Sequence, residues 1–187
     1  GLTNTEAKIN GVAIGRGARA PHNGVAVGKS IRTGQSGVGI GNSIDASLNA
    51  VAVGRGNRAS ISNVALGISN SATGEGTNIS IGYLNTTSGN SGVSIGFQNQ
   101  NQHFSSMGIG FFNSNNSRTT VAVGHSNSSN TGAVVFGRSN SGNQGHNINS
   151  SRTVIVGMFN NNNGRRADAF GNHPMLAVGF NNENNKN

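Results

Sequence analysis

The sequence has no cysteine and no tryptophan, and it is poor in aromatic side chains and in long apolar runs. The absence of cysteine excludes disulfide bonds; it fits an extracellular fibre held by backbone hydrogen bonds, and it fits a reducing compartment equally well. No stretch approaches the roughly 20 apolar residues of a membrane-spanning helix. Hydrophobic residues form 33% of the chain and aromatic residues 5%, which argues against an ordinary globular core.

Acidic side chains are also scarce, and this limits the chemistry that one chain can perform. The five acidic residues are scattered along the sequence: Glu6, Asp45, Glu75, Asp168 and Glu183. They offer no carboxylate pair for glycoside cleavage within one chain, although a site between chains stays open. The five histidines share no metal-ligand spacing: His22, His103, His125, His146 and His173. We therefore expect a protein that is not an enzyme and that has no cofactor and no metal site.

What the chain does contain is a repeated phrase, apolar-small-apolar-Gly, about every 13 to 15 residues. Clear copies occupy residues 12–15, 25–28, 38–41, 51–54, 64–67, 79–82, 93–96, 107–110 and 121–124. Looser copies end at Gly137, Gly157, Gly171 and Gly179. A fixed period indicates one structural unit stacked on itself. The alternation within the phrase predicts a very short β-strand that ends at the Gly, where unusual backbone angles are tolerated.

A coil of about 14 residues has room for two short strands and two tight turns, so the sequence predicts an all-β, narrow β-solenoid. Small or polar residues five positions after the Gly are expected to point inward: Ala20, Thr33, Ala46, Ala59, Ala72, Thr87, Asn101, Asn115 and Ser129. From the fifth coil on, an Asn follows the Gly by three positions: Asn70, Asn85, Asn99, Asn113, Asn127, Asn140 and Asn160. This Asn fits a left-handed corner, and its side chain can bond to the next Asn along the solenoid.

The middle residue of the phrase is always small in the clear copies. Two or three apolar side chains per coil would leave a single chain marginally stable, so we expect the small column to pack against neighbouring chains in a closed homo-oligomer. The candidate contacts between chains are Ala13, Ala26, Gly39, Ala52, Ala65, Ser80, Ser94, Gly108 and Ala122.

The phrases at residues 23–28 (NGVAVG) and 63–67 (NVALG), with Ala five residues after the Gly, resemble the head repeats of trimeric autotransporter adhesins of the YadA type. The resemblance covers nearly the whole chain. It implies a left-handed parallel β-roll, a side-by-side homotrimer, and a place on the bacterial cell surface, where such heads serve cell adhesion, host attachment and virulence. Similar repeats occur in bacteriophage tail fibres. The coils here are richer in Asn and Arg and poorer in Ala than adhesin heads, and nothing after Asn182 resembles a neck, stalk or anchor, which favours the virion tail fibre.

The pattern divides the chain into a partial coil or cap (1–11), regular β-roll coils (12–137), irregular coils with inserted loops (138–180) and a polar tail (181–187). The first residues do not form a signal peptide, and the chain looks like a piece of a longer protein. About 20 residues separate Gly137 from Gly157 and about 22 separate Gly157 from Gly179. The two inserted loops are expected to contact a receptor or to cap the solenoid; their candidate residues are His146, Asn147, Arg165, Arg166 and His173.

Basic residues give the chain a net charge of +8 and recur one and four positions after the Gly in the first coils. The candidates for anionic ligands are Arg16, Arg19, Lys29, Arg32, Arg55 and Arg58. Asp45 falls between Arg32 and Arg58 in the repeat, so two interpretations stay open: a solvated Arg-Asp-Arg stack, or a binding stripe for acidic polysaccharide or lipopolysaccharide phosphate. Nucleic acid is an unlikely partner because aromatic residues are not interleaved with these cations.

In later coils, aromatic residues take the position after the Gly. The candidates are Tyr83, Phe97, Phe111 and Phe112, and they either pack between chains or form an exposed strip for sugar rings or a protein receptor.

The function expected is non-enzymatic attachment of a homotrimer to a surface glycan, lipopolysaccharide or extracellular-matrix protein, without membrane insertion. A phage receptor-binding fibre and a structural spacer remain the alternatives, and an ice-binding face lacks the Thr ladder it would need.

Overall fold

The computed structural model describes residues 5–116, 118–129, 132–144, 153–164, 175–181 and 183–184, and every regular element within them is a β-strand. The chain divides into two compact units, Gly1–Ser91 and Gly92–Asn187, which we call the N-terminal and the C-terminal unit. In the described part of the chain, no helix has the length and apolar character that crossing a membrane requires.

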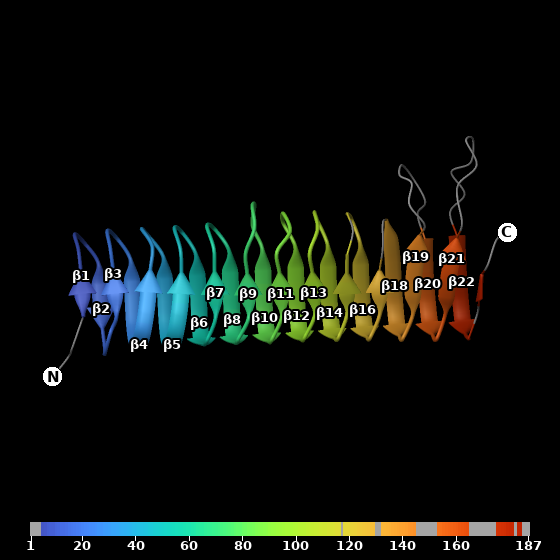
Figure 1. Ribbon diagram of the computed structural model, residues 1–187, viewed down its shortest axis with the longest axis horizontal. Coiled ribbons are helices and arrows are strands. Elements are labelled where there is room, and N and C mark those ends of the chain that lie inside the picture. The colour runs from blue at the N-terminus through green and yellow to red at the C-terminus, as the bar shows by residue number, and fades with distance from the viewer. Residues whose placement is uncertain are drawn as a thin grey trace. The chain divides into compact units, whose positions relative to one another are not determined.

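The described residues of the N-terminal unit form eleven strands. They are β1 (Glu6–Ala7), β2 (Val12–Ile14), β3 (Arg19–Ala20), β4 (Val25–Thr33), β5 (Val38–Ala46), β6 (Val51–Arg55), β7 (Arg58–Ala59), β8 (Val64–Ile68), β9 (Ser71–Ala72), β10 (Ile79–Tyr83) and β11 (Thr86–Thr87). Each strand pairs in parallel with the equivalent strand one coil away; β6, for example, pairs with β8 through Val51 and Val64. The unit is therefore a parallel β-solenoid, in which the five-residue and two-residue strands run in opposite directions (Figure 1). The nine-residue strands β4 and β5 turn the corner and pair in parallel with strands of both kinds.

The C-terminal unit repeats this plan, and its described residues form twelve strands. They are β12 (Val93–Phe97), β13 (Gln100–Asn101), β14 (Met107–Phe111), β15 (Ser114–Asn115), β16 (Val121–His125), β17 (Ser128–Ser129), β18 (Ala133–Arg138), β19 (Ser141–Gln144), β20 (Thr153–Met158), β21 (Asn161–Gly164), β22 (Met175–Phe180) and β23 (Glu183–Asn184). The register survives the two long coils, because Gly137 pairs with Gly157 and Gly157 with Gly179. The extra residues of these coils are thus accommodated without shifting the strands.

The small middle residue of each phrase lies inside the roll, which corrects our expectation that this column contacts neighbouring chains. Eight of the nine candidates are buried within the single chain, and Ala13 is half-buried: Ala26, Gly39, Ala52, Ala65, Ser80, Ser94, Gly108 and Ala122. The flanking Val and Ile side chains, which we expected inside, point outward and are half-buried or exposed, as at Ile14 (58% exposed) and Ile40 (40%). The alternation was predicted correctly, but its direction was wrong.

The narrow interior explains this direction. A Cβ added to Gly39 would lie 2.7 Å from Cγ2 of Ile31 and 3.2 Å from Cγ2 of Ile44, so only a hydrogen fits opposite those side chains. In the C-terminal unit, a Cβ on Gly108 would lie 3.1 Å from the side-chain amide of Asn101. The residues five positions after the Gly are buried, as predicted, and they fill the space that the small column leaves.

The Gly that ends each phrase is required by its backbone angle and by its neighbour. Gly54 has φ +122, and a Cβ there would lie 1.9 Å from the carbonyl oxygen of Gly67 in the next coil. Gly124 in the C-terminal unit repeats both features, with φ +124 and 1.9 Å to the carbonyl oxygen of Gly137. The expectation that the strand ends at the Gly is wrong, because β6 and β16 run one residue further, to Arg55 and His125. The Gly is required by its backbone angle, as expected, and by the close stacking of the coils.

The predicted Asn ladder is present in both units. In the C-terminal unit, the side-chain amide of Asn113 donates to Oδ1 of Asn99 (2.9 Å), and its own Oδ1 accepts from the backbone N–H of Asn127 (3.2 Å). In the N-terminal unit the ladder begins one coil earlier than we expected, because the backbone N–H of Asn70 donates to Oδ1 of Asn57 (2.8 Å). These side chains are buried and satisfied, which makes them core residues.

The ladder Asn residues do not adopt the left-handed backbone that we assigned to them. The left-handed residue is the one before each Asn, two positions after the Gly, as at Ser69 (φ 54) and Ser126 (φ 54). The Asn can therefore turn its side chain into the roll. A second buried Asn pair, in which the backbone N–H of Asn78 donates to Oδ1 of Asn63 (2.7 Å), was not expected from the sequence.

Candidate functional site

The turn after each phrase displays side chains at fixed spacing. Its left-handed residue reverses the chain, so the residue one position after the Gly (the first column) and the residue four positions after it (the second column) both face outward. In the N-terminal unit the left-handed residues are Gly17, Ser30, Ser43, Gly56, Ser69 and Leu84. Backbone hydrogen bonds between coils hold this turn; the N–H of Ser30, for example, donates to the carbonyl of Arg16 (2.8 Å).

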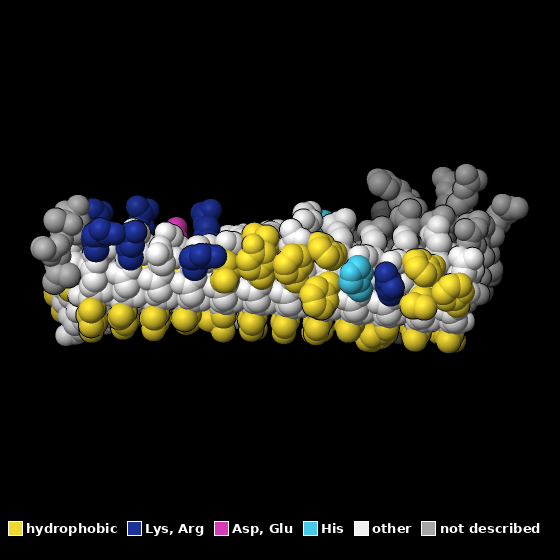
Figure 2. Space-filling view, turned by 90° about the horizontal axis from the view of Figure 1, so that it is seen from below, with side chains coloured by type: hydrophobic (Ala, Val, Ile, Leu, Met, Phe, Trp, Pro, Cys, Tyr) yellow, Lys and Arg dark blue, Asp and Glu magenta, His cyan; other side chains and the backbone are white. Residues whose placement is uncertain are grey.

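The basic candidates of the N-terminal unit occupy these two columns and are exposed. In the first column, Lys29 pairs with Asn42 and Asn42 with Arg55. In the second column the register runs Arg19, Arg32, Asp45 and Arg58. Figure 2 shows these basic side chains gathered over the strands of this unit.

No ion pair neutralises these columns among the residues that the structure describes. The single ion pair there joins Lys8 and Glu6 at 3.9 Å, and both side chains are largely exposed. Asp45 is half-buried and shares the register of its basic neighbours without pairing to them. The Arg-Asp-Arg stack therefore exists as an arrangement of charges, and its cations are available to a ligand.

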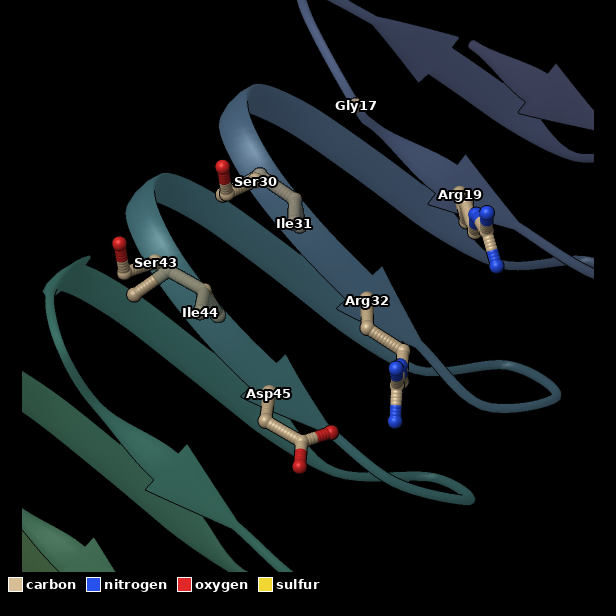
Figure 3. Close-up of a pocket in the computed structure, with 8 residues that line it drawn as sticks. All are labelled: Gly17, Arg19, Ser30, Ile31, Arg32, Ser43, Ile44 and Asp45. Carbon is tan, nitrogen blue, oxygen red and sulfur yellow. The ribbon is translucent and has the colours of Figure 1, made fainter. Parts of the chain in front are cut away.

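A shallow groove of about 430 Å³ lies over this part of the N-terminal unit (Figure 3). Its lining combines turn residues, the backbone over two buried isoleucines, and charged residues: Gly17, Arg19, Ser30, Ile31, Arg32, Ser43, Ile44 and Asp45. Figure 3 shows the hydroxyls of Ser30 and Ser43 at the turn and the three charged side chains further along the strands. We call this feature the basic groove.

In the C-terminal unit, the first column is aromatic. It runs in register through Phe97, Phe111 and His125 and continues to Arg138. The rings of Phe97 and Phe111 lie 6.2 Å apart with planes tilted by 32°, and those of Phe111 and His125 lie 6.3 Å apart at 27°. Three of the rings thus form a stepped stack along the solenoid, with a cation in the following coil.

Phe112 adds a fourth ring to this cluster from a strained position. Its ring packs edge-on to Phe97 (5.1 Å, 73°) and to His125 (5.8 Å, 65°). Phe112 is left-handed, with φ 56, in a position that holds Ser at Ser126 and Ser139. A bulky residue is unfavourable in this conformation. The exposed ring is therefore kept at a cost in backbone energy, which is a feature of binding and functional surfaces.

Other aromatic residues follow the same columns. Tyr83, at the end of β10 in the N-terminal unit, is exposed and precedes the left-handed Leu84. Near the end of the C-terminal unit, Met158 pairs with Phe180, and the ring of Phe159 lies 5.7 Å from that of Phe180. The candidate loop residues His146, Asn147, Arg165, Arg166 and His173 lie outside the described residues.

Sequence reasoning missed several residues of these surfaces. His125 and Arg138 continue the aromatic column, and Ser30 and Ser43 line the basic groove. Their signal was available, because all four occupy the first or second position after a phrase-ending Gly. The signal is a position in the repeat, which becomes visible when the same position, and not the same residue type, is followed from coil to coil.

A third surface is apolar. In each unit, the outward side chains of the phrase form a band of Val, Ile and Leu, seen as hydrophobic side chains along one edge in Figure 2. Exposure is greatest at Leu176 (68%) and Val178 (60%) in the C-terminal unit. Such a band is larger than scattered surface hydrophobics and is typical of an interface. We call it the apolar band.

Among the described residues, no group of three or more acidic or histidine side chains lies close enough together to hold a metal ion. Comparisons with protein-family models, with curated proteins and with solved structures gave no match. The fold defines the class, a parallel β-solenoid, and the surfaces described above carry the functional argument.

Proposed function

We propose that this chain is a non-enzymatic attachment segment that recognises a surface receptor through side chains displayed on the turns of a β-solenoid. The observation that carries this proposal is the pair of outward columns after each Gly. They hold unneutralised cations in the N-terminal unit and stacked aromatic rings in the C-terminal unit, where the strained, exposed Phe112 packs beside the first column. Neither arrangement is needed by the fold, since other coils fill the same positions with Asn and Ser.

We further propose that the chain works as a side-by-side homotrimer of left-handed β-rolls, with the apolar band between the chains. The resemblance to adhesin heads implies three chains, and burial of the apolar band would supply the apolar area that one narrow roll lacks. The interface assigned here replaces the small column, whose side chains lie inside the roll.

The oligomeric state is tested by mass measurement in solution. The wild-type chain should have the mass of a trimer, and Ile40→Lys should lower it because a charge would enter the apolar band. Leu48→Lys is the matched control, since Leu48 is similarly exposed (38%) but lies in the turn between β5 and β6, outside the repeated phrase. A folded wild-type monomer would overturn the trimer.

Attachment is tested by binding the labelled protein to a panel of whole bacteria and to extracellular-matrix proteins. Binding restricted to some bacterial strains would support a phage fibre that reads a glycan or lipopolysaccharide, and binding to matrix proteins would support an adhesin head on the bacterial surface. Absence of binding to every surface would overturn attachment and favour a structural spacer.

A further inference from the structure

The basic groove has features that select among anionic ligands. Arg19 and Arg32 are in-register neighbours, so their guanidinium groups repel each other across adjacent strands. Among the described residues, no acidic partner offsets this repulsion within ion-pair distance. A ligand that brings negative charge to the groove would offset it, and guanidinium groups bind carboxylates and sulfates through paired hydrogen bonds.

The cations are interrupted at one coil. In the coil of β5, Asn42 stands in the first column and Asp45 in the second, whereas the coils on either side carry a cation in both. Equivalent residues of neighbouring coils lie about 4.8 Å apart, so Arg32 and Arg58 are separated by about 10 Å with Asp45 between them. A polymer with a negative charge on every unit would meet the Asp45 carboxylate and be repelled there.

Hydroxyl-bearing ligands fit the interrupted coil. The Asp45 carboxylate accepts hydrogen bonds, and the Ser30 hydroxyl can donate and accept them. The Ser43 hydroxyl donates to Oδ1 of Asn42 (2.9 Å) and still offers an acceptor. Figure 3 shows Ser30 and Ser43 at the turns and Asp45 further along its strand. An uncharged sugar presents hydroxyls in both directions and has no charge for Asp45 to repel.

We infer that the basic groove binds a linear acidic polysaccharide in which charged sugars alternate with uncharged sugars. Within the groove, Arg19 and Arg32 hold one anionic group and Asp45 accepts hydrogen bonds from the uncharged sugar that follows. Arg58, which continues the second column one coil beyond the groove, holds the next anionic group. This inference rests on the proposed attachment function and names the receptor class for the N-terminal unit.

The test compares three soluble probes by calorimetric titration of the full chain. Hyaluronan oligosaccharides alternate charged and uncharged sugars, polygalacturonate is charged at every sugar, and single-stranded DNA is charged at every nucleotide. Hyaluronan should bind most tightly, with an affinity that falls as salt is raised. Tighter binding of either fully charged polymer, or no binding of hyaluronan, would overturn the inference.

Variants locate the site. Arg32→Gln should weaken hyaluronan binding about 10-fold, and Arg32→Lys should restore part of it. Arg118→Gln is the matched control, because it removes the same charge from an exposed position in the C-terminal unit that lies outside both columns, and it should leave hyaluronan binding unchanged. Equal losses of affinity in Arg32→Gln and Arg118→Gln would show that only the net charge matters and would overturn the groove.

Asp45→Asn keeps the size of the side chain and tests discrimination independently of the arginines. It should raise the affinity for polygalacturonate and DNA relative to hyaluronan, and an unchanged ratio would overturn the role of Asp45. Attachment to cells distinguishes the two proposals: if Arg32→Gln and free hyaluronan leave it intact, the groove assignment fails while the attachment function stands.

Discussion

The two units use the same backbone for different chemistry. At the position after the Gly, the N-terminal unit carries Lys29 and Arg55, whereas the C-terminal unit carries Phe97 and Phe111. Their interiors also differ. The apolar core of the N-terminal unit is largely alanine, with Ile31 and Ile44, and buried Asn and Ser such as Asn70 and Ser80 join it in the later coils. Among the described residues of the C-terminal unit, most buried side chains are Asn, Ser and Thr, beside Val135 and Ile155. The comparison teaches that the Gly column and the buried middle column define the coil, and that the outward columns are free to specialise.

The largest loss of stability should come from replacing the phrase-ending Gly, which both units share. Gly54→Ala and Gly124→Ala should each destabilise the fold by at least about 4 kcal/mol, because the new Cβ would collide with a backbone carbonyl of the next coil. Urea unfolding monitored by circular dichroism measures this. Gly17→Ala is the control: it is left-handed (φ 70), but its nearest neighbouring atom is 3.7 Å away, so it should cost only about 1 kcal/mol. Similar losses in all three variants would show that backbone angle alone matters.

The next largest loss of stability should follow the truncation of a buried side chain, and it can be compared between the Asn ladder of the C-terminal unit and the apolar core of the N-terminal unit. Asn113→Ala should cost about 3 kcal/mol, since it leaves the backbone N–H of Asn127 and the carbonyl of Gly124 without their buried partner. Ile44→Ala in the N-terminal unit should cost a similar 2–5 kcal/mol, roughly the range for a buried cavity. Unfolding midpoints of the two variants test whether the ladder stabilises its unit as strongly as side-chain packing does. A loss below about 1 kcal/mol in Asn113→Ala would show that the ladder contributes little.

The smallest effect on stability should occur where the units diverge most. Phe112→Ser removes ring contacts worth about 0.5–1.5 kcal/mol each but relieves a left-handed Phe, so the free energy of unfolding should change by no more than about 1 kcal/mol. Attachment to the receptor surface should nevertheless fall if the aromatic cluster binds it. Phe104→Ser is the control, because this exposed Phe lies outside the cluster and contacts Arg118 (5.1 Å). Equal attachment by both variants would leave Phe112 without a binding role.

Much of the fold was predictable because its rules are local. The alternation of the phrase, the Gly at its end and the buried positions five residues later follow from strand geometry and backbone angles at single residues. The Asn ladder was also predictable from its spacing, although Asn57 was missed because its coil neighbour on the N-terminal side is Ile44 rather than Asn.

The direction of the strand faces was not predictable by the usual rule that large apolar residues lie inside. That rule assumes an interior wide enough for them, and here the width is set by two strands that approach closely across the roll. The packing of Gly39 against Ile31 shows that the limit is the volume between strands, which no single residue reveals. The groove could be found only by comparing positions between coils, since it combines Ser30 and Ser43 at the turns with Arg19 and Arg32 further along the strands.

The stacked Gly column also constrains how such a chain can change over evolutionary time. Because Gly137, Gly157 and Gly179 stay in register despite unequal spacing, length can vary at the far turn of a coil without disturbing the rest. The turn at Gly74–Gly76, in a coil of about 15 residues, is an exposed example. The architecture therefore accepts the duplication or loss of whole coils and the insertion of new segments into that turn. Such changes can alter receptor preference while the strands and the Gly column stay the same.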